Sequence, residues 1–130
     1  MIAKGIEHIG IAVKSLKNSI LIYEKLLGVK CYATEKVEDQ FVNTAFFLVG
    51  QTKIELLEST DSAGPISSFI EKRGEGVHHL AFFVDDTNES LANAKENGGL
   101  VVGCSLRQAQ GKGCSLIFCF APPSLRLRSG

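Results

Sequence analysis

Two histidines stand at the head of two nearly identical segments of the sequence. His8 begins the run HIGIAV, and His79 begins the run HLAFFV, at an offset of 71 residues. A fold that pairs these segments about a pseudo-twofold axis brings both imidazoles to one cleft. Because imidazole is the commonest metal ligand in proteins, two facing histidines indicate a metal site.

A carboxylate can complete this set of ligands. The segment 53–57 alternates like a strand, so Glu55 faces away from Ile54 and Leu56 and points either to solvent or into a polar cleft. In a pseudo-symmetric fold Glu55 would lie beside both histidines. Two imidazoles and one carboxylate suit a divalent ion and leave positions open for water or a chelating substrate.

The histidines also have structural interpretations. His8 alone is more typical of a partly buried structural histidine, but the repeated placement at His79 favours a ligand. The neighbouring His78 is expected on the opposite face of its strand, because successive side chains of a strand alternate.

The elements that must position these residues form two units. In the first, a strand over 6–13 precedes a helix that is capped by Ser15 and ends at Gly28. The remaining strands of this unit are expected over residues 29–35, 41–49 and 53–57, with turns at 38–40 and 50–52. This order is a βαβββ unit.

The second unit begins in the same way. A strand over 77–84 precedes a helix over about 88–97, which Gly98 and Gly99 close. A helix over roughly 66–72, opened by Gly64-Pro65, links the units. Later strands are expected over residues 100–102, 116–121 and 125–128.

We therefore expect one domain over residues 1–130 with an α+β fold. Its parts are module one (5–60), a segment with the linker helix (61–76) and module two (77–130), which is atypical after about residue 98. The two βαβββ modules should form a curved mixed sheet with a metal-binding cleft.

Composition supports a packed globule and narrows the partners. The chain has 130 residues, 45% of them hydrophobic, and a formal net charge of zero, which offers no general signal for nucleic acid or membrane binding. It lacks an apolar run of about 18 residues and a signal-peptide pattern, so a soluble cytoplasmic protein is expected.

Three stretches resemble a known family. Residues 8–13, 49–58 and 69–82 together resemble the methylmalonyl-CoA epimerases, which lie within the vicinal oxygen chelate (glyoxalase-like) superfamily. The resemblance covers about residues 5–98. The first stretch is common to the superfamily, whereas the long stretch 69–82 points to the epimerases rather than to glyoxalases or ring-cleaving dioxygenases.

This resemblance implies a metal-assisted proton transfer, that is, an isomerase. The substrate would be methylmalonyl-CoA, whose epimers interconvert through a metal-stabilised enolate. The matching metal ligands are His8, Glu55 and His79, and Glu55 is also the candidate catalytic residue. Cobalt is the expected ion, with Mn²⁺, Zn²⁺ and Ni²⁺ as alternatives, and a homodimer is expected.

The family's fourth ligand, a glutamate on the last strand that also resembles a catalytic base, has no counterpart here. The position 71 residues after Glu55, at the same offset that separates His8 from His79, is Arg126. Arginine cannot ligate a metal. All 14 acidic residues precede residue 97. Three interpretations remain open: a shifted reading frame after about Gly98, a three-ligand metal enzyme of other chemistry, and a small-molecule binding protein without turnover.

Overall fold

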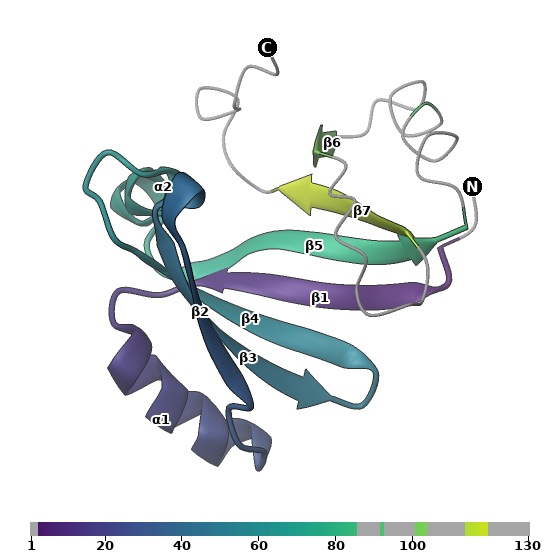
Figure 1. Ribbon diagram of the computed structural model, residues 1–130, viewed down its shortest axis with the longest axis horizontal. Helices are drawn as coiled ribbons and strands as arrows, with labels where there is room; N and C mark the ends of the chain where they lie inside the picture. The colour runs from purple at the N-terminus through teal and green to yellow at the C-terminus, as the bar shows by residue number, and fades with distance from the viewer. Residues whose placement is uncertain (1–2, 86–91, 93–100, 104–113, 120–130) are drawn as a thin grey trace.

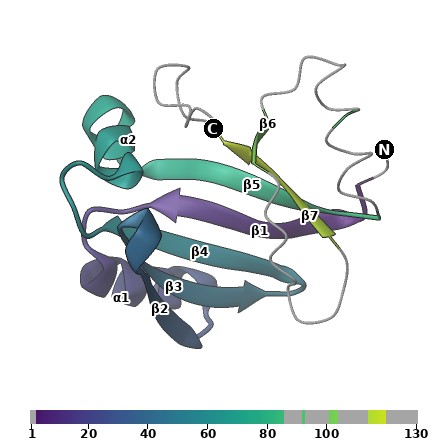
Figure 2. The ribbon, with the colours of Figure 1, turned by 45° about the horizontal axis from the view of Figure 1, so that its top comes forward.

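The computed structural model describes residues 3–85, 92, 101–103 and 114–119. Its strands form one mixed sheet in the order β2-β3-β4-β1-β5-β7-β6. Strands β1 and β5 lie side by side in the middle of this sheet, and both helices lie toward one end of the strands (Figure 1). A second view shows the same twisted sheet with the helices at that end (Figure 2).

The first βαβββ unit is complete. It consists of β1 (Gly5–Ala12), α1 (Leu16–Leu27), β2 (Ala33–Val37), β3 (Val42–Val49) and β4 (Thr52–Ser59), with a 3-10 turn η1 (Glu38–Gln40) before β3. The Ser15 hydroxyl accepts a hydrogen bond from the Asn18 backbone, and Gly28 ends α1 with a left-handed φ of 70°. Both helix signals predicted from the sequence are therefore confirmed.

One strand of this unit starts later than the sequence indicated. The predicted strand over 29–35 is observed as β2, which begins only at Ala33. Val29 and Cys31 instead pack against the core beneath α1, so this part of the segment serves as the connection from helix to strand.

The linker helix is α2 (Pro65–Arg73), which begins with a proline in its first turn and leads into β5 (Gly76–Val84). Strands β6 (Val101–Gly103) and β7 (Cys114–Cys119) follow. Strand β7 pairs antiparallel with β5, and β6 pairs antiparallel with β7. Of the predicted helix over 88–97, the structure describes only residue 92, which is helical, and the predicted strand over 125–128 lies outside the described residues.

Two core clusters hold the helices on opposite faces of the sheet. Leu56 and Phe47 belong to the cluster beneath α1, whereas the next residue of β4, Leu57, belongs to the cluster beneath α2. Neighbouring residues of a strand point to opposite faces, so each helix covers its own face. Leu56 and Phe47 are fully buried, which stabilises the fold by about 1.5–3 kcal/mol for each side chain.

Among the described residues, none of the helices has the length and apolar character that crossing a membrane requires.

Candidate metal centre

The two repeated histidines meet across the pairing of β1 with β5. These strands are antiparallel, with His8 opposite Ala81 and Gly10 opposite His79. The two histidines are thus diagonal neighbours on one face of the sheet. Their Nε2 atoms lie 3.0 Å apart, and their rings meet edge to face at 86°.

Gly10 leaves the space that the His79 ring occupies. A Cβ atom at Gly10 would lie 2.6 Å from Nε2 of His79, closer than real Cβ contacts come. Because Gly10 is the direct partner of His79 in the sheet, any side chain there would displace the imidazole. The glycine of the first repeat is therefore part of the site.

Glu55 completes a cluster of three ligand groups. Strand β4 runs parallel to β1 and pairs Glu55 with Gly10, which directs the carboxylate toward His8. Its Oε2 lies 3.6 Å from Nε2 of His8, and its surface is only 8% exposed. One ligand atom each from His8, Glu55 and His79 lies within 4.8 Å of the others.

This cluster fits a divalent ion. With metal–donor distances of about 2.1 Å, adjacent donors of a tetrahedral or octahedral site lie about 3.0–3.4 Å apart. The separations of 3.0 Å and 3.6 Å are close to this range. The structure thus brings together the three residues that the sequence indicated, in a triad that could bind a metal.

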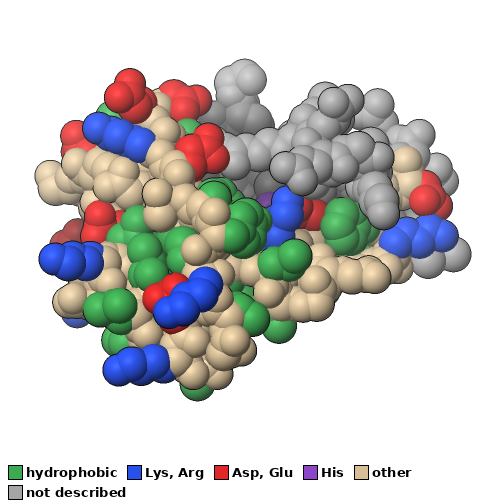
Figure 3. Space-filling model, turned by 60° about the horizontal axis from the view of Figure 1, so that its bottom comes forward, with side chains coloured by type: hydrophobic (Ala, Val, Ile, Leu, Met, Phe, Trp, Pro, Cys, Tyr) green, Lys and Arg blue, Asp and Glu red, His purple; other side chains and the backbone are tan. Residues whose placement is uncertain are grey.

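Glu7 supports this triad and was not predicted from the sequence as a residue of the site. Its carboxylate accepts a hydrogen bond from Nδ1 of His8, and its other oxygen lies 3.3 Å from Nζ of Lys53. In the space-filling view, a histidine is visible beside a basic and an acidic side chain (Figure 3). The available signal was an acidic residue directly before the repeated histidine.

The charge state of Glu7 follows from these neighbours. Burial raises the pKa of its carboxyl group, but the hydrogen bond and charge of His8 and the charge of Lys53 outweigh burial. The pKa therefore lies below its usual value, and Glu7 is a carboxylate at neutral pH.

The expected orientation of His78 is wrong. The register of β1 with β5 shifts between Gly10 and Ile11, which makes His78 an extra residue beside His79. Such a bulge re-aims a side chain and breaks the alternation on which the prediction relied. The Nδ1 atoms of His78 and His79 lie 3.0 Å apart, and burial lowers the pKa of His78, so its ring is neutral at neutral pH.

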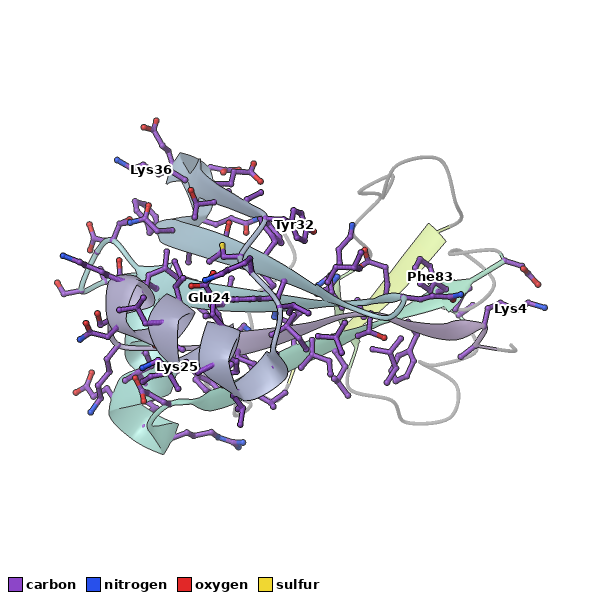
Figure 4. The ribbon with its side chains drawn as sticks, turned by 90° about the horizontal axis from the view of Figure 1, so that it is seen from below. Lys4, Glu24, Lys25, Tyr32, Lys36 and Phe83 are labelled. Carbon is purple, nitrogen blue, oxygen red and sulfur yellow. The ribbon has the colours of Figure 1, made fainter. Side chains whose placement is uncertain are left out.

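An aromatic pair lies on the same face of the sheet as Glu55. Phe46 pairs with Glu55 in the sheet, and the ring of Tyr32 lies 6.1 Å from that of Phe46. Tyr32 lies on the side of the sheet away from α1, which carries Lys25 (Figure 4). Burial raises the pKa of Tyr32, and the charge of Lys53 lowers the pKa by a smaller amount. The carboxylates of Glu7 and Glu55 also raise this pKa.

Arg126, the position that the internal offset assigns to the family's fourth ligand, lies outside the described residues.

The sequence profile of the Glyoxalase/Bleomycin resistance protein/Dioxygenase superfamily matches residues 7–118. The chain belongs to this superfamily. The match includes all three residues of the triad, the whole of β5 and β1 from Glu7 onward.

Relatives within the superfamily include epimerases. An uncharacterized protein of Bacillus subtilis, YqjC, is 44% identical over 86 residues, or 66% of this chain and 61% of its own length. An ethylmalonyl-CoA/methylmalonyl-CoA epimerase of Cereibacter sphaeroides is 33% identical over 99 residues, or 75% of this chain and 74% of the relative. The chain is thus related to methylmalonyl-CoA epimerases, and the match spans less than two thirds of YqjC.

A solved structure agrees with this relationship. A variant of the Streptomyces coelicolor methylmalonyl-CoA epimerase in complex with 2-nitronate-propionyl-CoA superimposes with a TM-score of 0.72 at 30% identity. The superposition covers 85% of this chain and 81% of that protein.

Proposed function

We propose that this protein is a metal-dependent epimerase of acyl-CoA thioesters, with methylmalonyl-CoA as its substrate. The observation that carries the proposal is the convergence of His8, Glu55 and His79 on one face of the sheet. The similarity to an ethylmalonyl-CoA/methylmalonyl-CoA epimerase at 33% identity supports the choice of substrate.

The donor set suits a borderline divalent ion. Two imidazole nitrogens and one carboxylate oxygen suit several such ions, and the family resemblance suggests Co²⁺, with Mn²⁺, Zn²⁺ and Ni²⁺ as alternatives. When bound, the ion would supply Lewis-acid stabilisation of the negative charge that develops on the substrate oxygens during proton removal.

The residues of the chain divide the remaining work. His8 and His79 would hold the ion through Nε2. The buried carboxylate of Glu55 lies 3.6 Å from Nε2 of His8 and within 4.8 Å of a ring nitrogen of His79, so one of its oxygens can bind the ion. As the acidic group of the triad, Glu55 is also the candidate acceptor of the substrate's α-proton, which a base must reach within hydrogen-bonding distance.

An alternative is a binding protein that holds a small molecule without turnover. One observation favours it: the chain has no acidic residue after Glu96, and Arg126 stands where the offset from Glu55 would place a carboxylate. Epimerisation needs a group that returns a proton to the opposite face of the carbon. Arginine cannot serve as this group, because its side chain stays protonated. Another metal enzyme with three protein ligands is consistent with the same observation.

Exchange of the substrate's α-proton with solvent separates turnover from binding. Methylmalonyl-CoA would be incubated in deuterium oxide with Co²⁺ and either the wild-type protein or the surface variant Glu71→Gln. The proposal predicts deuterium incorporation above the rate with Co²⁺ alone, equal for both proteins and lost in His79→Ala. Incorporation no faster than with Co²⁺ alone would overturn the enzyme proposal.

The oligomeric state is a separate proposal. We propose a homodimer, as the family resemblance suggests. Light scattering coupled to size-exclusion chromatography should give twice the chain mass, and a monomer mass at all concentrations would contradict it.

A further inference from the structure

The residue before each repeated histidine is displaced from its regular place in the sheet. Between β1 and β5 the register shifts at two points, once between Ile6 and His8 and once between Gly10 and Ile11. The first shift leaves Glu7 as the extra residue, and the second leaves His78. The internal repeat therefore extends to a pair of bulges, each beside a candidate ligand.

These two residues and the two ligands form a continuous chain of side-chain contacts. The ring of His8 contacts Glu7 through Nδ1 and His79 through Nε2. The ring of His79 contacts His8 through Nε2 and His78 through Nδ1. Each contact between two rings measures 3.0 Å.

The chemistry of these groups determines which group donates in each hydrogen bond of this series. A carboxylate only accepts hydrogen bonds, so Nδ1 of His8 must carry a proton. When His8 is a neutral imidazole, its Nε2 is then an acceptor, so Nε2 of His79 must donate to Nε2 of His8. Nδ1 of His79 is then an acceptor in turn, and Nδ1 of His78 must donate to it.

Glu7 is well suited to fix this direction. It keeps only 4% of its surface exposed, and its second oxygen lies 3.3 Å from Nζ of Lys53. Both oxygens therefore have partners, and Lys53 compensates the buried negative charge. The carboxylate can therefore hold the His8 ring by a hydrogen bond without itself becoming a metal ligand.

We propose that Glu7 is a positioning residue that presets His8 for metal binding, whereas His79 must change its tautomer before its Nε2 can bind an ion. This inference rests on the proposed metal centre. In the metal-free protein the hydrogen bonds run from His78 through His79 and His8 to Glu7. Metal binding through Nε2 of His79 requires that the proton of this ring be on Nδ1, which then donates to Nδ1 of His78. The proton of His78 is then on Nε2, so the three rings together neither gain nor lose a proton.

Nuclear magnetic resonance of the ring nitrogens tests this proposal. Long-range correlation spectra of the full chain would be recorded at mildly alkaline pH, before and after addition of Zn²⁺, which is diamagnetic. We expect His8 with its proton on Nδ1 in both spectra. His79 should change from an Nε2 proton to an Nδ1 proton, and His78 from Nδ1 to Nε2. A metal-free protein in which His79 already carries its proton on Nδ1 would overturn the proposal.

A conservative variant tests the role of Glu7 separately. The amide of Glu7→Gln fits the same space but carries no charge and can donate as well as accept. We expect His8 to populate both tautomers in this variant and the affinity for Zn²⁺ to fall by about 10-fold or more. The matched variant Glu71→Gln, at an exposed site on α2, should match the wild type in both measurements. A single Nδ1–H tautomer of His8 with wild-type affinity in Glu7→Gln would contradict a positioning role.

The metal-free spectra keep this proposal distinct from the proposed function. They report the hydrogen-bond chain even if no ion binds and no substrate turns over. If the spectra show the expected tautomers but the protein does not exchange the substrate α-proton, only the epimerase proposal is contradicted.

Discussion

The Nε2 atoms of His8 and His79 lie 3.0 Å apart although the two residues are separated by 71 positions in the chain. The antiparallel pairing of β1 with β5 creates this proximity, and the parallel pairing of β1 with β4 adds Glu55 to it. The candidate metal centre is thus a property of three neighbouring strands, and its residues can be tested one at a time.

The two roles of Glu55 can be separated by two substitutions. Glu55→Gln retains an oxygen atom that can coordinate the metal but cannot accept a proton, whereas Glu55→Ala loses both functions. With saturating Co²⁺, Glu55→Gln should exchange the substrate α-proton at least roughly 100-fold more slowly than the wild type. Calorimetry should show a weaker affinity for Co²⁺ in Glu55→Ala than in Glu55→Gln. Wild-type exchange in Glu55→Gln would exclude Glu55 as the base.

Gly10 is expected to be sensitive to the smallest substitution. In Gly10→Ala the new methyl group would occupy the space of the His79 ring, and such overpacking costs typically about 1–3 kcal/mol. The free energy of unfolding should fall by this amount, and affinity for Co²⁺ should fall by at least about 10-fold as the ring is displaced. Unchanged values in urea unfolding and calorimetry would show that the ring occupies another position.

Glu58 ties β4 to the start of α1 and is expected to matter for stability. Its Oε2 accepts a hydrogen bond of 2.7 Å from the backbone N–H of Leu16, and its Oε1 accepts one from Asn43. Glu58→Ala should lower the free energy of unfolding by about 1–3 kcal/mol, because both donors lose their acceptor.

A surface carboxylate provides the control for Glu58. Glu38→Ala, at an exposed site, should change stability by less than about 0.5 kcal/mol. Equal effects of the two substitutions in urea unfolding would contradict the role of Glu58.

Tyr32 can report the charge at the site without being a ligand. Its pKa is raised by burial and by the carboxylates of Glu7 and Glu55, against the smaller effect of Lys53. A bound divalent cation adds positive charge, which favours the phenolate, so Zn²⁺ should lower this pKa. Ultraviolet titration of the wild type against Tyr32→Phe measures the shift. The same pKa with and without Zn²⁺ would place the ion elsewhere.

Much of this site could be predicted from the sequence because its main elements follow regular periods. The repeat at His8 and His79 and the alternation around Glu55 indicated the three ligand candidates, and Ser15 and Gly28 indicated the ends of α1. Each signal is a short local pattern, and the repeat is found by comparing two such patterns 71 residues apart, so the pairing of the strands did not have to be known in advance.

The supporting residues could not be predicted in the same way. Glu7 and His78 reach the site because of register shifts between two strands that are distant in the sequence. A bulge moves one side chain out of the alternating pattern, and it becomes visible only when the partner strand is known. The late start of β2 has a similar origin, because Val29 and Cys31 pack beneath α1 instead of joining the sheet.

The most direct test of the metal centre is calorimetric titration of Co²⁺ into the wild-type protein, His79→Ala and the control Glu71→Gln. Wild type and control should bind one ion per chain with equal affinity, and His79→Ala should bind at least about 100-fold more weakly, since it loses a direct ligand. Equal affinity in His79→Ala, or no binding by the wild type, would contradict a metal centre formed by His8, Glu55 and His79.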